Sequence, residues 1–151
     1  MNVAVIGCGV RGSVAAALLA GAGVEELSLV DEALVEETDV GRHPLQFSPD
    51  VGSGKADALV AKLALVNSRI HAQAFPANLS AENATAILIG ASCVLDCASS
   101  SEVAGWIADA AEQLEIPVIG APDNYDATVA SAAAATAVGA TQADQALTLR
   151  G

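Results

Sequence analysis

The sequence predicts an α/β fold: a Rossmann-like, doubly wound, mainly parallel sheet of order about 3-2-1-4-5, with helices on both faces. Short apolar runs alternate with longer segments of helical period, which is typical of parallel strands joined by crossover helices. A Gly-x-Gly-x-x-Gly motif at residues 7–12 separates the first apolar run from the first helical segment. The chain has 151 residues, 53% of them hydrophobic, which is enough for one domain with a packed core.

The first part of the chain predicts two strands around one helix. Residues 3–6 are short and β-branched, as expected of a strand that is buried on both faces. Residues 12–22 form an Ala/Leu-rich helix that glycines bring to an end. Residues 27–30 are the second strand, which leads directly into Asp31.

A long irregular segment follows at residues 32–54. It has no clean period and contains Pro44, Pro49 and three glycines. Segments of this length inside a compact domain are usually functional, so we expect a functional loop with a short helical turn. Residues 55–67 then return to helical spacing.

The second half continues the same alternation of strands and helices. The last helix is rich in small residues, and we expect Gly139 to break or bend it. The expected elements are a weak strand at 71–75, a brief helix that starts near 80–83 and ends near Gly90, a strand at 93–97, a Ser-capped helix at 101–114, a strand at 117–120, a turn at 123–126 and the long helix at 128–149.

The charge of the chain limits its partners. Eighteen acidic and six basic residues give a net charge of −12. A surface this negative repels phosphate backbones and anionic lipid, so we expect neither a nucleic-acid nor a membrane partner. The three cysteines form no Cys-x-x-Cys pair, and the first residues have no basic start of a signal peptide. A cytoplasmic location without disulfides or structural zinc is therefore expected.

The glycine motif predicts a nucleotide site. Gly7 allows a tight turn, Gly9 lets a phosphate approach the backbone, and Gly12 lets helix and sheet pack closely. The start of the helix attracts phosphate through its amides and its positive dipole end. Asp31, nineteen residues after Gly12, can accept hydrogen bonds from ribose hydroxyls. These features alone leave NAD, FAD and ATP open.

The segment after the second strand resembles the ThiF/MoeB/HesA branch of the ubiquitin-activating-enzyme superfamily. Arg42 lies eleven residues after Asp31, and Lys55 lies thirteen residues after Arg42, inside an Asp-Val-Gly-x-x-Lys-Ala motif at residues 50–56. Both spacings are those of the family pattern. Further matches are Asn67 at the close of the following helix, Val-Leu-Asp-Cys at residues 94–97, and a late Gly-x-x-Gln-Ala helix within residues 138–147.

The resemblance implies one ThiF-type adenylation domain over residues 1–151. Its activity would be the ATP-dependent activation of the C-terminal glycine of a ubiquitin-like or sulfur-carrier protein, in a homodimer or a heterodimer with a related subunit. Arg42 and Lys55 would be the catalytic cations that, with Mg²⁺, stabilise the charge on the phosphates. The implied nucleotide-binding residues are Gly7, Gly9, Val10, Arg11, Gly12, Asp31, Arg42, Lys55 and Ser99.

The sequence departs from the family pattern at positions expected to lie near the metal ion and the ATP phosphates. Ser99 stands where the family has a magnesium-binding Asp, and a hydroxyl supplies no negative charge to hold Mg²⁺. Asp39 and His43 replace the family's Asn and Gln beside Arg42. An acid so close to the phosphates would weaken ATP binding unless Arg42 or a metal pairs with it.

Two further departures concern the rest of the family's active site. The sequence begins at the first strand, without the family's preceding helix and its Arg, so Arg11 is either a substitute cation or a surface residue at a helix start. After Gly120 the chain runs almost directly to the last helix, where relatives have much of the surface that grips the carrier. None of the three cysteines is expected to act as a thioester nucleophile.

Two alternatives to an active adenylyltransferase remain open. A non-catalytic nucleotide-binding subunit of a heteromeric enzyme is favoured by Ser99 and the short section after Gly120, and opposed by Arg42 and Lys55. An NAD-binding oxidoreductase domain would explain the glycines and Asp31, but it leaves the spacing of Arg42 and Lys55 as a coincidence.

Overall fold

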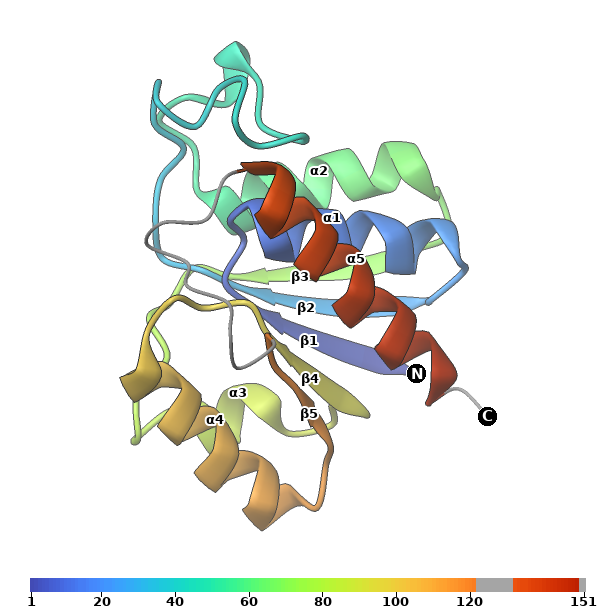
Figure 1. Cartoon of the computed structure of the whole chain (residues 1–151), viewed down its shortest axis with the longest axis vertical. Coiled ribbons are helices and arrows are strands. Elements are labelled where there is room, and N and C mark those ends of the chain that lie inside the picture. The colour runs from blue at the N-terminus through green and yellow to red at the C-terminus, as the bar shows by residue number, and fades with distance from the viewer. Residues whose placement is uncertain (122–131, 150–151) are drawn as a thin grey trace.

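A five-stranded parallel sheet forms the centre of the fold (Figure 1). The computed structural model describes residues 1–121 and 132–149. The strand order is β3-β2-β1-β4-β5, which confirms the expected Rossmann-like topology. The strands are β1 (Asn2–Ile6), β2 (Glu26–Val30), β3 (His71–Phe75), β4 (Cys93–Asp96) and β5 (Val118–Ile119).

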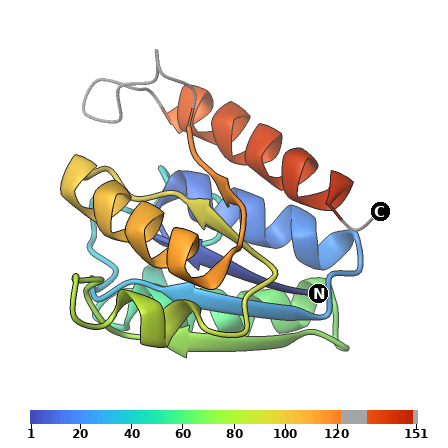
Figure 2. The same ribbon diagram turned by 90° about the horizontal axis from the view of Figure 1, so that it is seen from below.

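Helices cover both faces of this sheet, as the sequence predicts. Helices α1, α2 and α5 lie on one face, and α3 and α4 lie on the other (Figures 1 and 2). No helix in the described part of the chain is long and apolar enough to cross a membrane. The helices are α1 (Val10–Gly21), α2 (Lys55–Val66), α3 (Ala84–Leu88), α4 (Ser101–Leu114) and α5 (Ala132–Thr148).

Strand β1 is buried on both faces because its alternate side chains enter two different cores. Val3 and Val5 pack with residues of α1, α2 and α5, whereas Ala4 and Ile6 pack with residues of α3 and α4. All four side chains are at most 3% exposed. A strand with two cores needs apolar residues at successive positions, which accounts for its unbroken apolar sequence.

The last helix differs from its prediction. Helix α5 runs unbroken through Gly139, so of the expected break or bend at this residue the break is wrong. A Cβ atom at Gly139 would clash with the backbone carbonyl oxygen of Arg11, so the glycine allows α5 to lie close against α1. The predicted turn at 123–126 and the predicted first residues of this helix, 128–131, lie outside the described residues.

Two other helix starts follow from local hydrogen bonds. Ser100 caps α4, and its Oγ accepts a hydrogen bond from the Val103 amide at 3.4 Å, as expected of a Ser cap. Helix α3 starts later than predicted because Ser80 donates its amide to Asn83 Oδ1 at 2.8 Å and forms a turn before the helix. The expected helical turn of the long loop is present at Ser48–Asp50.

Candidate functional site

A cavity of about 330 Å³ lies at the carboxyl ends of β1, β2 and β4. In sheets of this order, ligands bind beside the strand at which the order reverses, here β1 and its neighbour β4. Five predicted site residues line the cavity: Gly7, Gly9, Asp31, Lys55 and Ser99. The volume is at the lower end of the ~300–1,000 Å³ typical of small-molecule sites. Its other lining residues are Ile6, Val30, Glu32, Ala33, Ala77, Asn78, Leu79, Cys97, Ala98 and Val103.

The glycines of the turn have two different structural roles: two are required by packing within the protein, and one leaves space at the cavity. Gly7 has a φ of +93°, and a Cβ there would lie 2.8 Å from the Cys97 carbonyl oxygen. A Cβ at Gly12 would clash with the Gly7 carbonyl oxygen, so both glycines are required by the protein's own packing. At Gly9 the nearest described atom to such a Cβ is His43 Cε1, at 3.8 Å. Packing therefore does not require Gly9, which lies on the cavity wall with room for a ligand beside its backbone.

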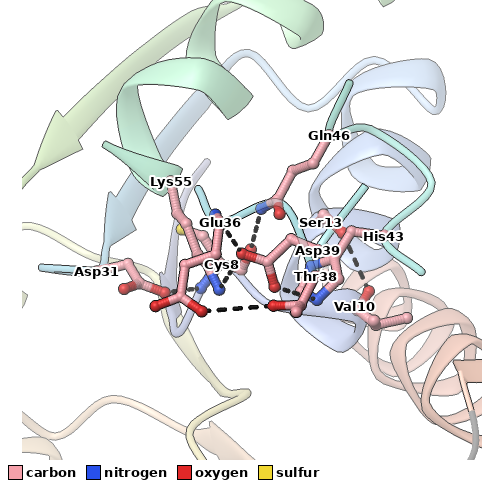
Figure 3. A network of polar contacts seen from close by, with 10 residues as sticks. All are labelled: Cys8, Val10, Ser13, Asp31, Glu36, Thr38, Asp39, His43, Gln46 and Lys55. Atoms are coloured by element: carbon pink, nitrogen blue, oxygen red, sulfur yellow. Dashed lines mark hydrogen bonds and ion pairs between the residues drawn. The ribbon is translucent and has the colours of Figure 1, made fainter. Parts of the chain in front are cut away.

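Asp31 connects the end of β2 to the glycine turn. Its Oδ2 accepts a hydrogen bond from the Cys8 amide at 2.7 Å (Figure 3). Its Oδ1 accepts one from the Ala33 amide at 2.8 Å. These bonds hold the carboxylate at the cavity wall in one orientation. A carboxylate has about four acceptor sites, so Asp31 retains capacity for ligand hydroxyls.

Lys55 is ion-paired with an acid of the long loop. Its Nζ lies 3.0 Å from Asp39 Oδ2, and the opposite oxygen, Oδ1, lies 3.2 Å from His43 Nε2 (Figure 3). The Glu36 amide also donates to Asp39 Oδ2 at 2.9 Å. From the sequence, pairing with Arg42 or a metal is the condition under which Asp39 would not weaken ATP binding; in the structure the cation paired with Asp39 is Lys55.

The protonation states in this cluster follow from its surroundings. Burial alone would raise the pKa of Asp39, but the Glu36 amide, Lys55 and His43 more than offset burial and lower it. Asp39 is therefore a carboxylate at neutral pH. Burial lowers the pKa of His43 despite the adjacent Asp39, so its imidazole is neutral at neutral pH, with Nε2 at 3.2 Å from Asp39 Oδ1.

The two predicted arginines take different positions. Arg42 is exposed on the loop, where its backbone amide donates to the Asp39 carbonyl oxygen at 3.0 Å. Arg11 is only 6% exposed, and its Nη2 donates to the Ala98 carbonyl oxygen at 2.6 Å, so the reading of Arg11 as a surface residue is wrong. Neither arginine is among the described residues that line the cavity, and the same is true of Val10 and Gly12.

Several residues of the family-like motifs support the site without lining it. Asp50 accepts hydrogen bonds from the Phe47 amide at 2.8 Å and from Lys62 Nζ at 2.7 Å, which attaches the long loop to α2. Asn67 donates from Nδ2 to the Ala20 carbonyl oxygen at 3.0 Å and joins α2 to α1. Gln142 is fully buried and ties α5 to the ends of β4 and β5.

The described residues do not form a protein-built magnesium site. The described residues contain no group of three His, Cys, Asp or Glu side chains that could hold a metal ion. Ser99 offers the cavity a hydroxyl, and the carboxylates that line it are Asp31 and Glu32. Burial raises the pKa of Asp96. Its Oδ1 accepts a hydrogen bond from the Ala98 amide at 3.1 Å, so this carboxylate stabilises the backbone at the end of β4. We therefore assign no step of the chemistry to a protein-held metal.

The three cysteines are core thiols, as the sequence predicts. Cys8, Cys93 and Cys97 are all buried. Burial raises the pKa of Cys97 to about 12 and that of Cys93 to about 11, and it also raises the pKa of Cys8. A thiol nucleophile needs an accessible thiolate, and none of these groups supplies one at neutral pH.

The residues of one cavity wall were not predicted from the sequence. Ala77, Asn78 and Leu79 come from the connection after β3, and Val103 comes from the first turn of α4. These residues could have been predicted from their positions in the sequence, because loops that follow parallel strands lie at the same edge of a sheet. Glu32 and Ala33, directly after β2, follow from the same rule.

The strand order, the glycine turn and the cavity beside β1 together define a Rossmann-like α/β protein. A family model described as "ThiF family" matches residues 1–148. The chain therefore belongs to the ThiF family, which confirms the resemblance inferred from its motifs.

Curated relatives include longer proteins. The chain is similar to the adenylyltransferase and sulfurtransferase UBA4 of Saccharomyces cerevisiae, with 34% identity over 120 residues that cover 80% of this chain and 27% of the relative. For UBA4 of Meyerozyma guilliermondii the identity is 34% over 115 residues, which cover 76% of this chain and 27% of the relative. The chain thus spans about a quarter of the length of these relatives.

Solved structures share the fold. The E. coli MccB structure with ATP superimposes with a TM-score of 0.82 at 20% identity, covering 96% of this chain and 54% of that one. The E. coli tRNA N6-threonylcarbamoyladenosine dehydratase, TcdA, in complex with ATP, gives a TM-score of 0.75 at 24% identity, covering 84% and 54%. At these identities the likeness establishes a common architecture.

Proposed function

We propose that the protein binds ATP in this cavity and adenylates the C-terminal glycine carboxylate of a ubiquitin-like or sulfur-carrier protein. The observation that carries the proposal is the meeting of the glycine turn, Asp31 and Lys55 at one cavity beside β1. Membership of the ThiF family and similarity to UBA4 adenylyltransferases support it. The nucleotide and the carrier remain proposals, as does the single adenylation domain over residues 1–151.

In the proposed reaction, the negative charge on the ATP phosphates lies near Lys55, the basic side chain of the cavity wall. A carboxylate oxygen of the carrier attacks the α-phosphorus of ATP, the new O–P bond gives an acyl-adenylate, and pyrophosphate leaves with the electrons of the broken bond. Lys55 would leave Asp39 and stabilise the phosphates, while Asp31 orients the ribose and the Gly9 backbone accommodates the phosphate. Arg42 would approach from the long loop.

ATP–pyrophosphate exchange in the presence of candidate carriers tests this proposal. We expect exchange that depends on a carrier ending in glycine and falls by at least about 100-fold in Lys55→Ala and Arg42→Ala, the usual scale for a transition-state donor. Arg69→Ala removes an exposed arginine just before β3, at the end of the sheet opposite the cavity, and is the matched control. Nucleotide binding without exchange, with every carrier tried, would count against the adenylyltransferase.

A non-catalytic nucleotide-binding subunit is the second candidate. Ser99 at the cavity wall, the exposed position of Arg42 and the pairing of Lys55 with Asp39 favour it. Such a subunit would work beside a complete partner, as a heterodimer. Calorimetry with ATP, with and without Mg²⁺, separates the two candidates. An ATP affinity that does not depend on Mg²⁺ supports the non-catalytic subunit. NADH binding tighter than ATP would instead favour an oxidoreductase domain.

A dimer is proposed on the basis of the late small-residue helix. In its described side chains, Ala143 and Ala146 are buried within the chain, whereas Thr141, Asp144 and Gln145 are exposed. A partner would therefore contact the exposed polar side of this helix segment. Sedimentation velocity of the purified chain, alone and mixed with a related subunit, distinguishes a homodimer from a heterodimer.

A further inference from the structure

The cavity has little positive charge with which to attract a polyphosphate. Within the described residues, Lys55 is the one basic side chain that lines it, and Asp31 and Glu32 line it as well. The charge of Lys55 is already matched by Asp39, at 3.0 Å. A ligand phosphate and the Asp39 carboxylate therefore compete for the same ammonium group.

We propose that Asp39 is a specificity-determining residue that weakens the binding of polyphosphate, without preventing it, by holding Lys55. The site would then accept a nucleoside or a nucleoside monophosphate with less penalty than a nucleoside triphosphate. A triphosphate must displace the carboxylate and then remains beside its negative charge. This inference rests on the proposed function, because it takes the ligand to be a nucleotide.

The geometry allows Lys55 to exchange partners while Asp39 stays in place. Asp39 Oδ2 also accepts the Glu36 amide at 2.9 Å, and Oδ1 lies 3.2 Å from His43 Nε2. Those two contacts remain when the ammonium group leaves, so the carboxylate is not stripped of partners. The side chain of Lys55 has a flexible four-carbon stem and already reaches the cavity wall.

The charge that opposes a phosphate is present under working conditions. The side chains of Asp39 and Lys55 are only 12% and 15% exposed, so water screens their interaction weakly. The surrounding donors keep the pKa of Asp39 below its usual value, and the carboxylate is ionised at neutral pH. An amide at this position would keep an oxygen for the Glu36 amide and remove the charge.

Calorimetric titrations of the full chain with adenosine, AMP and ATP, in EDTA, test the inference. Asp39→Asn should bind ATP about tenfold more tightly than the wild type, which is ~1.4 kcal/mol. AMP should gain less, and adenosine less than about twofold. Asp57→Asn is the matched control: it removes the same charge from an exposed residue of the first turn of α2 and should change no affinity by more than about twofold.

A double-mutant cycle tests whether the effect passes through Lys55. In a Lys55→Ala background, Asp39→Asn should have much less effect on ATP, because no ammonium group remains to be released. An undiminished effect there overturns the role of Lys55, and so does equal tightening of all three ligands. If Asp39→Asn does not fold, Asp39→Ser keeps an acceptor for the Glu36 amide and should show the same preference for ATP.

The outcomes separate this inference from the proposed function. ATP binding that is equal in the wild type and in both Asp39 variants overturns the inference and leaves the proposed function standing. The absence of binding by any of the three ligands, to every folded variant, overturns both together. Thermal unfolding of each variant verifies that it is folded.

Discussion

Gly139 of α5 faces the backbone carbonyl oxygen of Arg11 in α1, with no room for a side chain between them. A Cβ at Gly139 would also lie 3.0 Å from the Cα atom of Arg11. The two helices therefore approach through backbone atoms. Since Arg11 lies within the glycine motif and donates to Ala98, this contact fixes the start of α1 at the cavity.

Gly139→Ala should destabilise the protein by ~2 kcal/mol, because α5 must move away from α1 to admit the methyl group. Gly105→Ala is the control: it is an exposed helical glycine of α4, and no described atom lies within 4 Å of its Cβ position. It should gain ~0.5–1 kcal/mol, the usual advantage of alanine in a helix. Urea unfolding measures both, and equal effects of the two substitutions would contradict the close approach of the helices.

Gln142→Met should cost ~1–3 kcal/mol of folding free energy. Nε2 of Gln142 donates to the carbonyl oxygens of Asp96, at 2.9 Å, and of Ile119, at 3.1 Å. Methionine fills the space but leaves both part-buried carbonyl oxygens without this donor. Gln145→Met, on the exposed side of the same helix, should change stability by less than ~0.5 kcal/mol. Similar unfolding midpoints for the two variants would exclude an anchoring role for Gln142.

Asp50→Asn should lower stability at pH 7 by ~1 kcal/mol, through loss of the ion pair with Lys62. Lys62 and the Phe47 amide lower the pKa of Asp50 in the folded state. Its stabilisation is therefore present above the unfolded pKa of ~3.9 and is lost as the pH falls through the folded value. Denaturant unfolding between pH 7 and pH 3 should show the wild type and the variant converging at low pH. A constant difference across this range would refute the ionised pair as the cause.

The three thiols should resist alkylation in the folded protein. At pH 8 we expect iodoacetamide to react with Cys8, Cys93 and Cys97 at least ~100-fold more slowly than in the unfolded chain, because burial blocks access and raises each pKa. Mass spectrometry counts the modified residues, and unfolding in guanidinium should expose all three. One rapidly modified thiol in the native state would reopen the question of a cysteine nucleophile.

The periodicity of the sequence predicts the strands and helices well, because the side chains that each element buries must recur at the period of that element. His71–Phe75 and Ser101–Leu114 match their predicted bounds, since each element alternates or repeats against a core. The sequence does not distinguish a glycine that breaks or bends a helix from a glycine that a neighbouring backbone requires, as Arg11 requires Gly139. Only the packing of α5 on α1 distinguishes them.

The candidate site could be predicted where strand ends determine it. Gly7, Asp31 and Ser99 follow buried strands, so topology alone brings them to one cavity. Arg42 and Asp39 lie in an irregular loop whose path depends on individual hydrogen bonds. No periodic pattern reports those bonds, so the pairing of Asp39 with Lys55 could not be foreseen.

The hydrogen bond from Arg11 to Ala98 joins residues that are 87 positions apart, and its consequence concerns the order of assembly during synthesis. The glycine turn is translated before the opposite wall of the cavity, at Cys97 to Ser99. A nascent chain that has not yet paired β1 with β4 therefore has no cavity. Any ligand of the cavity would bind only the completed sheet and so shift the folding equilibrium toward it.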